Sequence, residues 1–317
     1  MSRWISRFRK NQVVWLSTAI HHQKPSQASP PPIRVSITES AGRGVFATRR
    51  IEAGQLIHTA KPLLTHPSLS TLNTVCYFCL RNITPNNNTS HHFQAHHLLF
   101  CSEHCKHNSK VFYDVESRAD WSAFHDYCRS QGLKYPLLAK RLACMIISGA
   151  ASADFVDILQ PASLSNETIS QMDEGFGLLR NAFVKADIMD EQMTFLSKQW
   201  YASVLSRIRI NAFRIELAGG SYEDLLSMAA ASIEAEIAVG NAVYMLPSFY
   251  NHDCDPNVHI VWIENADARL KALRDVEEGE ELRICYIDVS MSRDARQTVL
   301  SQGFGFQCNC PRCLSGE

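Results

Sequence analysis

The sequence has no long apolar run, almost no net charge and no apolar stretch near its N-terminus that is typical of a secretory signal. In its 317 residues, even the Ala-rich segment 228–243 is interrupted by Glu234 and Glu236, so no membrane-spanning helix of about 20 apolar residues is expected. Lys and Arg number 31 against 32 Asp and Glu, a formal net charge of -1. This balance gives no overall attraction to nucleic acid or to an anionic membrane. We therefore expect neither membrane insertion nor direct nucleic-acid binding.

Acidic residues are absent before Glu39. The first 38 positions hold six serines and the basic residues Arg3, Arg7, Arg9, Lys10, Lys24 and Arg34. An acid-free N-terminus rich in Arg and Ser is typical of a mitochondrial or plastid transit peptide. A disordered basic tail that acts as a nuclear signal has a similar composition. With the Pro-rich stretch 29–32 as its end, we interpret residues 1–32 as a targeting or disordered basic leader.

The eleven cysteines fall into short-spaced groups. They include two pairs and one triplet: Cys76 and Cys79, Cys101 and Cys105, and Cys308, Cys310 and Cys313. Short spacings favour a metal over disulfides, because neighbouring thiolates can bind one tetrahedral zinc ion. The two pairs together make a complete four-thiolate site. The triplet needs a fourth ligand, for which Cys254 is the candidate.

Histidines between and after the two cysteine pairs suggest a second zinc ion in the same region. The candidate ligands are His92, His96, His125 and Cys128, since His and Cys side chains can share a tetrahedral zinc. A run of histidines on a polar loop is equally typical of a solvated surface. Both interpretations of this region stay open.

Strand-like patterns open and close the chain, and a helical pattern separates them. Strand-like runs next to turn residues occur at 34–38, 45–48, 55–58, 258–263, 270–272 and 282–286. From 135 to 240 the apolar residues recur at helical spacing. The chain is 45% hydrophobic, enough to bury a core. This order predicts one split domain with a cysteine-rich module and helices inserted in it.

Five motifs carry a family resemblance: Gly42–Ala47, Asn211–Phe213, Asn251–Asn257, Glu280–Tyr286 and Phe304–Cys313. With these motifs in this order, the chain resembles SET-domain protein-lysine methyltransferases of the SMYD type. In that type a MYND zinc finger and a helical segment interrupt the SET domain. The chain also resembles the small plant SET proteins of the ATXR class.

The resemblance implies an α+β fold built of short strands and small sheets. It divides the chain into an N-terminal SET part (33–70), a MYND-like zinc finger (71–132), a helical SET insert (133–240), a C-terminal SET part (241–290) and a zinc-binding post-SET tail (291–317). In this family the cysteine of the Asn251–Asn257 motif, here Cys254, joins the C-terminal cysteines around a structural zinc.

The implied reaction transfers a methyl group from S-adenosylmethionine to the side-chain amine of a lysine. The residues implied to bind S-adenosylmethionine are Arg43, Gly44, Asn211, Ser248, Asn251, His252, Tyr286 and Phe306. Tyr286 takes the position of the active-site tyrosine. Tyr244 and Phe304 are expected to wall the lysine channel, although either ring can instead pack in the core. A desolvated aromatic channel favours the neutral amine.

Three departures from the family pattern stand out. His92 and His96 lie near the places where the MYND finger has a second cysteine pair. Between Trp121 and Cys128 the histidine, His125, lies one residue out of step with the family's Trp-x2-His-x3-Cys pattern. Both departures bear on the second zinc and on the finger's role in peptide binding. The sequence also stops without the long helical C-terminal domain of the animal SMYD proteins, which predicts a more open substrate cleft.

The expected function is that of a protein-lysine N-methyltransferase, with a histone lysine as the substrate implied by the family. S-adenosylmethionine and Zn2+ are the expected cofactors, and a monomer is expected. The family resemblance favours the nucleus, whereas the leader favours a mitochondrion or plastid. The alternative is a catalytically silent adaptor that recruits a partner through its finger.

Overall fold

The computed structural model describes residues 30–83, 93–95, 98–218 and 238–316. The chain divides into a unit Met1–Pro31 and a unit Pro32–Glu317, so the expected leader lies almost wholly outside the described residues. The helices are α2 (Glu103–Glu116), α3 (Ser122–Ser130), α4 (Tyr135–Ile147), α5 (Asn166–Lys185), α6 (Lys198–Asn211), α8 (Arg293–Phe304) and α9 (Pro311–Leu314), with 3-10 turns η1 (Asp190–Met193) and η2 (Pro247–Phe249). The strands are β1 (Ile33–Ile37), β2 (Arg43–Ala47), β3 (Leu56–Ala60), β4 (Leu64–Pro67), β5 (Phe93–Ala95), β6 (Leu98–Phe100), β7 (Ala212–Glu216), β8 (Ala238–Val243), β9 (Asn251–His252), β10 (Val258–Val261), β11 (Ala268–Ala272) and β12 (Glu281–Ile284).

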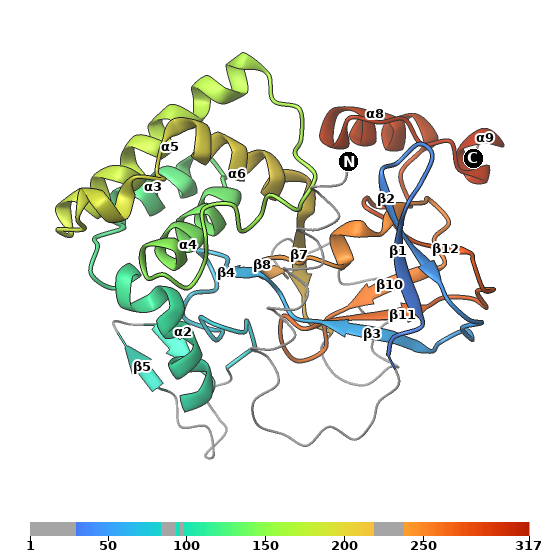
Figure 1. The fold of residues 1–317 in the computed structure, drawn as a ribbon, viewed down its shortest axis with the longest axis horizontal. Coiled ribbons are helices and arrows are strands. Elements are labelled where there is room, and N and C mark those ends of the chain that lie inside the picture. The colour runs from blue at the N-terminus through green and yellow to red at the C-terminus, as the bar shows by residue number, and fades with distance from the viewer. Residues whose placement is uncertain (1–29, 84–92, 96–97, 219–237, 317) are drawn as a thin grey trace. The chain divides into compact units, whose positions relative to one another are not determined.

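Small sheets join strands that are far apart in the sequence (Figure 1). Their orders are β1-β2-β12-β9, β10-β11-β3 and β4-β8-β7, and β5 pairs with β6. The N-terminal hairpin pairs β1 with β2, from Ile33 opposite Ala47 to Ile37 opposite Arg43. Because β12 pairs with β2 and β11 with β3, both ends of the split domain build the same sheets. The expected split α+β arrangement is therefore confirmed.

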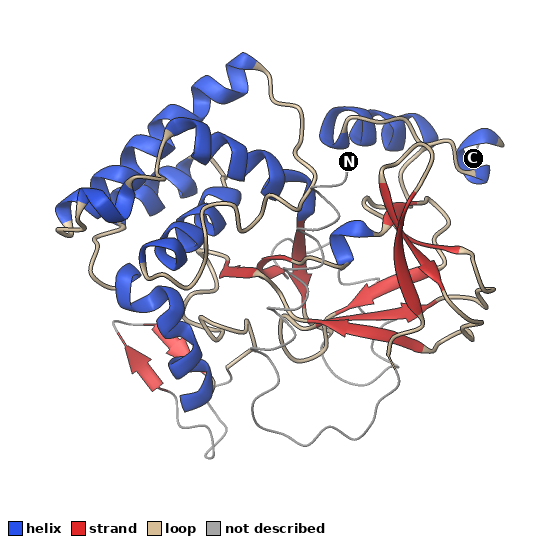
Figure 2. Cartoon of the chain, viewed as in Figure 1, coloured by secondary structure: helices blue, strands red, loops and turns tan. Residues whose placement is uncertain are grey.

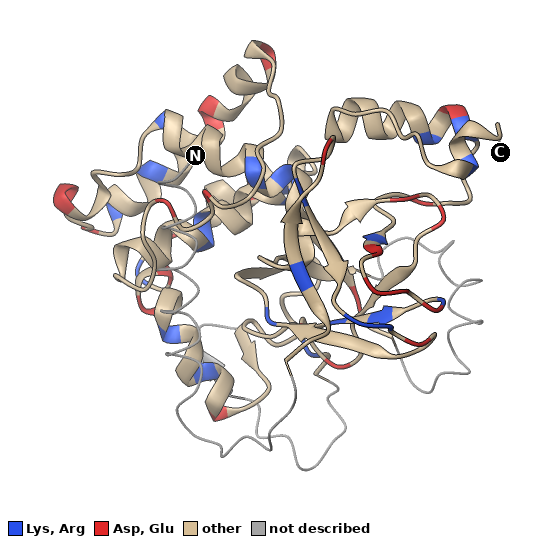
Figure 3. Cartoon of the chain, turned by 45° about the vertical axis from the view of Figure 1, so that its right-hand side comes forward, with Lys and Arg blue, Asp and Glu red and all other residues tan. Residues whose placement is uncertain are grey.

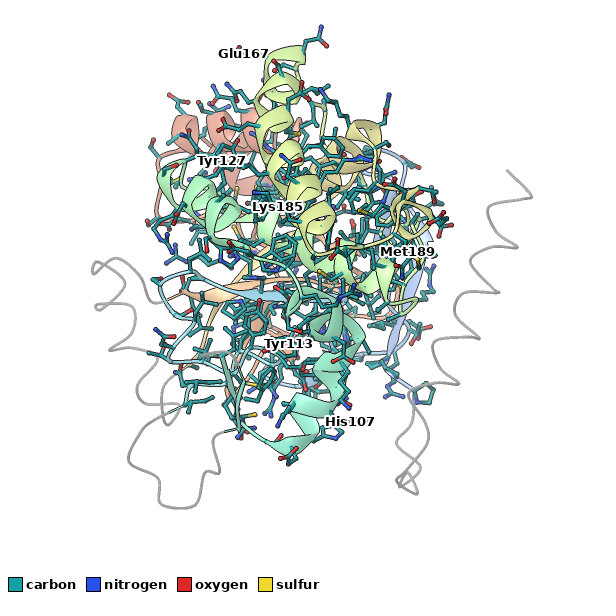
Figure 4. All side chains as sticks on the ribbon, turned by 90° about the vertical axis from the view of Figure 1, so that its left-hand side faces the viewer. His107, Tyr113, Tyr127, Glu167, Lys185 and Met189 are labelled. Atoms are coloured by element: carbon teal, nitrogen blue, oxygen red, sulfur yellow. The ribbon has the colours of Figure 1, made fainter. Side chains whose placement is uncertain are left out.

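Helices α2 to α6 gather beside these sheets (Figure 2). Helix α4 packs against α2, α6 and β4, and it is buried along most of its length, with Leu138 and Leu142 fully covered. Figure 4 looks onto α2, α3 and α5, where Tyr127 of α3 lies near α5. Its hydroxyl donates to the carbonyl of Gln171, 3.2 Å away. The helical group thus has its own interior, continuous with that of the sheets.

Serine side chains begin four of the helices. Ser102, Ser165, Ser197 and Ser292 each accept a hydrogen bond from the backbone N–H three residues later, at the start of α2, α5, α6 and α8. These caps satisfy donors that a helix start otherwise leaves unpaired, and each is worth about 1 kcal/mol. The starts of these four helices are therefore determined by local sequence.

The region 133–240, expected as a helical insert, ends in strands. Helix α6 stops at Asn211, and β7 and β8 pair with each other and with β4. Strand β8 is the central strand of its sheet and is buried at every position, so both of its faces are covered. Such a strand lacks the alternating pattern that marks a half-buried one. A Cβ at Gly240 would collide with the backbone of His66. The helical prediction fails here because short strands of five and six residues next to a long helix give too few positions to reveal their own period.

A buried ionic cluster ties α2 to α4. The Lys140 ammonium lies 2.5 Å from Glu116 Oε1, and both side chains are at most 3% exposed. The hydroxyl of Tyr77 donates to the same oxygen at 2.5 Å, and the guanidinium of Arg141 lies 3.8 Å from the ring centre of Phe112. Burial alone raises the pKa of Glu116, but Lys140 and Arg141 outweigh it and hold the pKa at about 2. The carboxylate is therefore charged, and the cysteine-rich module is fixed to the helices behind it.

The charged residues of the described segments are mixed in sign. Figure 3 shows Lys and Arg interspersed with Asp and Glu over the helices and the sheets. Among the described helices, none is long and apolar enough to cross a bilayer.

Candidate active site

The candidate site lies where β9 pairs with β12. In this parallel pairing Asn251 stands opposite Arg283 and His252 opposite Ile284, and Tyr286 follows β12 two residues later. Strand β2 borders β12 on its other side and supplies Arg43 and Gly44. The pairing therefore brings together segments more than 200 residues apart in the sequence.

The side chain of Asn251 bridges two strands. Its Nδ2 donates to the carbonyl of Arg43 at 3.0 Å and to Glu281 Oε1 at 2.7 Å. The other oxygen of Glu281 accepts from Arg283 at 2.6 Å. Hydrogen bonds to a charged group are stronger than neutral ones, so Glu281 fixes the orientation of the Asn251 amide.

Gly44 lies where no side chain fits. A Cβ there would come within 2.7 Å of Glu281 Oε1, 2.8 Å of Thr38 Cγ2 and 3.2 Å of Asn251 Nδ2. Next to it, the Arg43 guanidinium lies 4.3 Å from the ring centre of Phe249, and burial lowers the pKa of Arg43. The backbone of β2 can therefore approach β9 and a ligand beside it closely.

His252 connects the end of β12 with a cysteine. Its Nδ1 accepts from the backbone N–H of Tyr286 at 3.1 Å, and its Nε2 lies 3.3 Å from Cys254 Sγ. Burial lowers the pKa of His252 to about 4, so the ring is neutral near pH 7. A neutral imidazole donates from one nitrogen only. Because Nδ1 accepts, Nε2 carries the proton and points it at the sulfur.

The phenol of Tyr286 is held at both ends. Its hydroxyl donates to the carbonyl of Tyr250 at 2.6 Å, and its backbone is held by His252 as described above. Burial raises the pKa of Tyr286, so the phenol stays protonated. With its proton engaged by a carbonyl, the oxygen still has lone pairs to offer a ligand.

Two phenylalanines complete an aromatic group around Tyr286. The ring of Phe304, at the end of α8, lies 5.1 Å from that of Tyr286, and the ring of Phe306 lies 6.4 Å from it. Gly305 between them adopts a left-handed conformation with φ 79°, which ends the helix and turns the chain so that both rings reach the site. Phe306 is 36% exposed. The aromatic group therefore has a buried side and a side open to solvent.

The first cysteine cluster consists of Cys76, Cys79, Cys101 and Cys105. Their sulfurs all lie within 4.8 Å of one another, and Cys101 Sγ is 3.5 Å from both Cys79 Sγ and Cys105 Sγ. Zinc–sulfur bonds of about 2.3 Å place tetrahedral sulfurs about 3.8 Å apart, whereas a disulfide needs about 2.05 Å. All four cysteines are free. The spacing fits a zinc ion bound by four thiolates.

The second cluster joins Cys254 to the C-terminal cysteines. The sulfurs of Cys254, Cys308, Cys310 and Cys313 likewise lie within 4.8 Å of one another, with Cys254 Sγ 3.9 Å from Cys308 Sγ and 3.6 Å from Cys313 Sγ. The buried Arg296 guanidinium approaches Cys313 Sγ at 3.7 Å. A zinc ion with four thiolates carries two negative charges, which offset a buried cation. The donor set and its surroundings therefore fit zinc.

A family profile and several curated relatives match this chain. The profile of the SET domain matches residues 42–287. The chain belongs to the SET-domain family. The histone-lysine N-methyltransferase ATXR4 of Arabidopsis thaliana is 64% identical over 302 residues, which cover 95% of this chain and 92% of that protein. A SET and MYND domain-containing protein of Dictyostelium discoideum is 22% identical over 82% of this chain and 77% of its own length. Human histone-lysine N-methyltransferase SMYD3 is 44% identical over 79 residues, 25% of this chain and 18% of that protein.

Within this SET domain, three residues expected at the site make side-chain hydrogen bonds to the rest of the chain. Tyr244 is fully buried, and its hydroxyl donates to the carbonyl of Ala266 at 2.6 Å and accepts from Trp262 at 2.8 Å. Asn211, the last residue of α6, donates to the carbonyls of Gln160 and Arg207. Ser248 donates to the carbonyl of Tyr244. Both side chains keep acceptor oxygens for a ligand. Tyr244 is thus a core residue, which was the other interpretation of this ring. Its hydrogen bonds to distant parts of the chain were invisible in the sequence.

The second finger zinc meets an obstacle at His125. Its Nε2 lies 3.1 Å from the Lys140 ammonium, so the lone pair of that nitrogen is taken by an N–H donor. A metal cation beside a buried ammonium is also repelled. Among the described residues, neither His125 nor Cys128 belongs to a group of three or more close ligands, and His92 and His96 lie outside them. His125 as placed does not fit a zinc ligand through Nε2.

Three residues that shape the SET-domain site were not predicted from the sequence. Glu281 lies within the Glu280–Tyr286 motif, two residues before Arg283, and this spacing places both side chains on one face of β12. The spacing could therefore have predicted their ion pair. His58 and Tyr250 gave no such signal, because a lone histidine in an apolar strand and a tyrosine before a motif are common.

Proposed function

We propose that this SET-domain protein is an S-adenosylmethionine-dependent protein-lysine N-methyltransferase. The observation that carries the proposal is 64% identity, over nearly the whole of both chains, to a protein named histone-lysine N-methyltransferase. The cluster of Asn251, His252 and Tyr286 beside Gly44 supports it, because this geometry suits a ligand with an amino-acid end and a reactive centre.

Strand β2 and the start of β9 form the cofactor side of the proposed site. Gly44 leaves room for backbone to approach the cofactor, Asn251 is pre-oriented by Glu281, and Arg43 flanks them. Phe306, partly exposed beside His252, offers a flat face for a ring to stack on. When bound, S-adenosylmethionine supplies a methyl group activated by a positively charged sulfur.

The rings of Tyr286 and Phe304 form the proposed lysine side. Apolar rings disfavour the charged ammonium of lysine, whose ordinary pKa is about 10.4, and so favour its neutral form. The neutral nitrogen forms the new bond to the methyl carbon as the carbon–sulfur bond breaks, and the amine releases a proton to solvent. The Tyr286 oxygen is positioned to orient the amine. Alignment of reacting groups supplies a large part of the rate gain.

The second cysteine cluster has a structural role in this proposal. It fixes the segment after α8, and with it Phe306, against the motif that contains Asn251 and Cys254. Removing zinc from it would open the aromatic side, so activity would be lost without loss of any reacting group.

The substrate and the compartment belong together, and both are part of the proposal. We favour a histone lysine as the substrate, because the relative ATXR4 is named a histone-lysine N-methyltransferase. A histone substrate in turn favours the nucleus. If the basic leader directs the protein to a mitochondrion or plastid, an organellar protein takes the place of the histone.

The test is methyl transfer by the full-length, zinc-loaded chain. Methyl-labelled S-adenosylmethionine would be supplied with histones in one reaction and with an organelle extract in another. Asn251→Ala and Tyr286→Phe are the site variants. Asn166→Ala, exposed at the start of α5, and Tyr201→Phe, in the helical core, are the matched controls.

We expect label with the parent and both controls, and at least tenfold less with each site variant, a loss of about 1.4 kcal/mol of transition-state stabilisation. Label on histones alone supports the nuclear substrate, and label on organelle proteins alone supports the transit-peptide interpretation. Absence of label in both pools, from a folded protein with its zinc, would favour the adaptor.

A further inference from the structure

Two buried polar side chains next to the site have no part in the proposed mechanism. Tyr250 is fully buried and immediately precedes Asn251, and His58 on β3 is 7% exposed. The hydroxyl of Tyr250 and Nε2 of His58 lie 2.9 Å apart, and their ring centres are 5.9 Å apart. Burial lowers the pKa of His58 to about 4, so this is a hydrogen bond between two neutral groups.

The pair is one bond away from the active-site phenol. The backbone carbonyl of Tyr250 accepts the hydrogen bond from the Tyr286 hydroxyl at 2.6 Å. A run of contacts therefore leads from the His58 ring to the Tyr250 ring, through the Tyr250 backbone, to the Tyr286 oxygen. The His58 and Tyr250 side chains are both buried, so water does not freely replace the hydrogen bond between them.

This run of contacts also crosses between two sheets. His58 belongs to the sheet β10-β11-β3, whereas Tyr286 follows β12 of the sheet β1-β2-β12-β9. Tyr250 itself lies in the turn between η2 and β9, where few backbone bonds fix the chain. Its N–H bonds only within this turn, to the carbonyl of Pro247 at 3.3 Å. The side-chain hydrogen bond to His58 therefore fixes this residue, as backbone hydrogen bonds would in a helix or strand.

A buried hydrogen bond of this kind is costly to break on one side only. Removing one partner leaves the other buried without a hydrogen bond, and this destabilises the local conformation. Either change removes the side-chain bond that holds Tyr250, whose backbone carbonyl sets the position of the Tyr286 hydroxyl. A displacement of that carbonyl by a fraction of an ångström moves the phenol by a similar distance.

We propose that His58 and Tyr250 form a positioning pair that holds the hydroxyl of Tyr286 in place for the transfer reaction. The expected effect on kcat rests on the proposed methyltransferase function, whereas the effect on the position of the Tyr286 hydroxyl does not. The pair acts through Tyr286 and touches neither substrate nor cofactor in this account.

The test uses conservative variants of the full-length, zinc-loaded protein. Tyr250→Phe removes only the hydroxyl, His58→Phe removes the ring nitrogens, and His58→Gln retains a donor and an acceptor. Tyr201→Phe is the matched control, because Tyr201 is also fully buried, lies on α6, and its hydroxyl has no hydrogen-bond partner among the described residues. Zinc content and thermal midpoint would be measured for every variant.

The first readout is independent of activity. With 3-fluorotyrosine placed at position 286, the fluorine resonance reports the surroundings of that phenol directly. We expect a shifted or broadened resonance in Tyr250→Phe and His58→Phe, a near-parent resonance in His58→Gln, and the parent resonance in Tyr201→Phe.

The second readout is kinetic. We expect Tyr250→Phe and His58→Phe to lower kcat about tenfold, the scale of a sub-ångström misalignment, with KM for S-adenosylmethionine unchanged within about twofold, since Asn251 and Gly44 remain in place. His58→Gln should restore most of kcat.

Two results distinguish the possible failures. If the fluorine resonance and kcat stay at parent values in Tyr250→Phe and His58→Phe, the pair is ordinary core packing and the inference is overturned. If the resonance moves as expected while the parent transfers no methyl group to any substrate, the positioning of Tyr286 stands and the proposed function fails instead.

Discussion

Replacing Gly44 with alanine should damage the cofactor side of the site without touching any reacting group. The new methyl group would lie 2.7 Å from Glu281 Oε1, 2.8 Å from Thr38 Cγ2 and 3.2 Å from Asn251 Nδ2. Ordinary contacts begin near 3.4 Å, so two neighbours must move by more than half an ångström. One of them, Glu281, is clamped by Asn251 and Arg283 and cannot swing away freely.

The expected size follows from that crowding. Overpacking of this kind costs about 1–3 kcal/mol of folding stability, which lowers the thermal midpoint by roughly 2–10 °C in a domain of this size. Disturbing the Asn251 amide should weaken the binding of S-adenosylmethionine roughly tenfold, equivalent to about 1.4 kcal/mol. Calorimetric titration with S-adenosylmethionine and thermal unfolding measure the two effects separately.

Gly177→Ala is the matched control. Gly177 lies inside α5, and a Cβ there meets nothing within 4 Å. The same substitution should therefore stabilise the protein by about 0.5–1 kcal/mol, since glycine disfavours a helix interior, and leave cofactor binding unchanged. Parent-like binding and stability in Gly44→Ala would refute the assignment of this glycine to a closely packed cofactor site.

Further predictions concern the metal and the buried ionic cluster. The purified chain should contain two zinc ions, and X-ray absorption should show sulfur ligands only. Cys308→Ser should lose one zinc ion and His125→Ala should lose neither. A third zinc ion that is lost in His125→Ala would contradict the placement of that ring. Glu116→Gln should destabilise the protein by about 3–5 kcal/mol, because it leaves the Lys140 ammonium buried without its anion; equal denaturation midpoints would argue against the ion pair. Because the pKa of Glu116 is lowered from 4.5 to about 2, its contribution is present above about pH 4.5 and is lost as the pH falls towards 2, by about 3 kcal/mol. Unfolding curves from pH 5 to 2 should therefore fall less steeply in Glu116→Gln.

Short-range signals in the sequence predicted much of the fold. The glycine-containing turn and the short cysteine spacings are local features of the sequence. The structure has the β1–β2 hairpin at the turn and clustered sulfurs at the cysteines. The motif order also led to the family that the profile match and the relatives confirm. Cys254 lies with the C-terminal cysteines, as the resemblance implied, although nothing local links segments 54 residues apart.

Predictions failed or stayed incomplete where a residue's partner comes from a distant element. Tyr244 was expected in a channel but points into the core, because Trp262 and Ala266 bind its hydroxyl. His125 has the residue type of a metal ligand, yet Lys140 from the next helix lies 3.1 Å from its Nε2. Strand β8 was hidden in a helical prediction because burial on both faces erases alternation, and β7 was hidden because its five residues continue directly from helix α6. Each case depends on tertiary partners, which periodicity and residue type do not encode.

The bond between His252 and Cys254 has a consequence for how the protein is made. Cys254 precedes Cys308, Cys310 and Cys313 by more than 50 residues, so a growing chain contains Gly44, Asn251 and His252 while three of the four ligands are still missing. The tail that supplies these ligands also supplies Phe304 and Phe306, so the aromatic group around Tyr286 and the metal site are completed together. Catalytic competence is therefore coupled to the zinc supply of the compartment in which folding finishes.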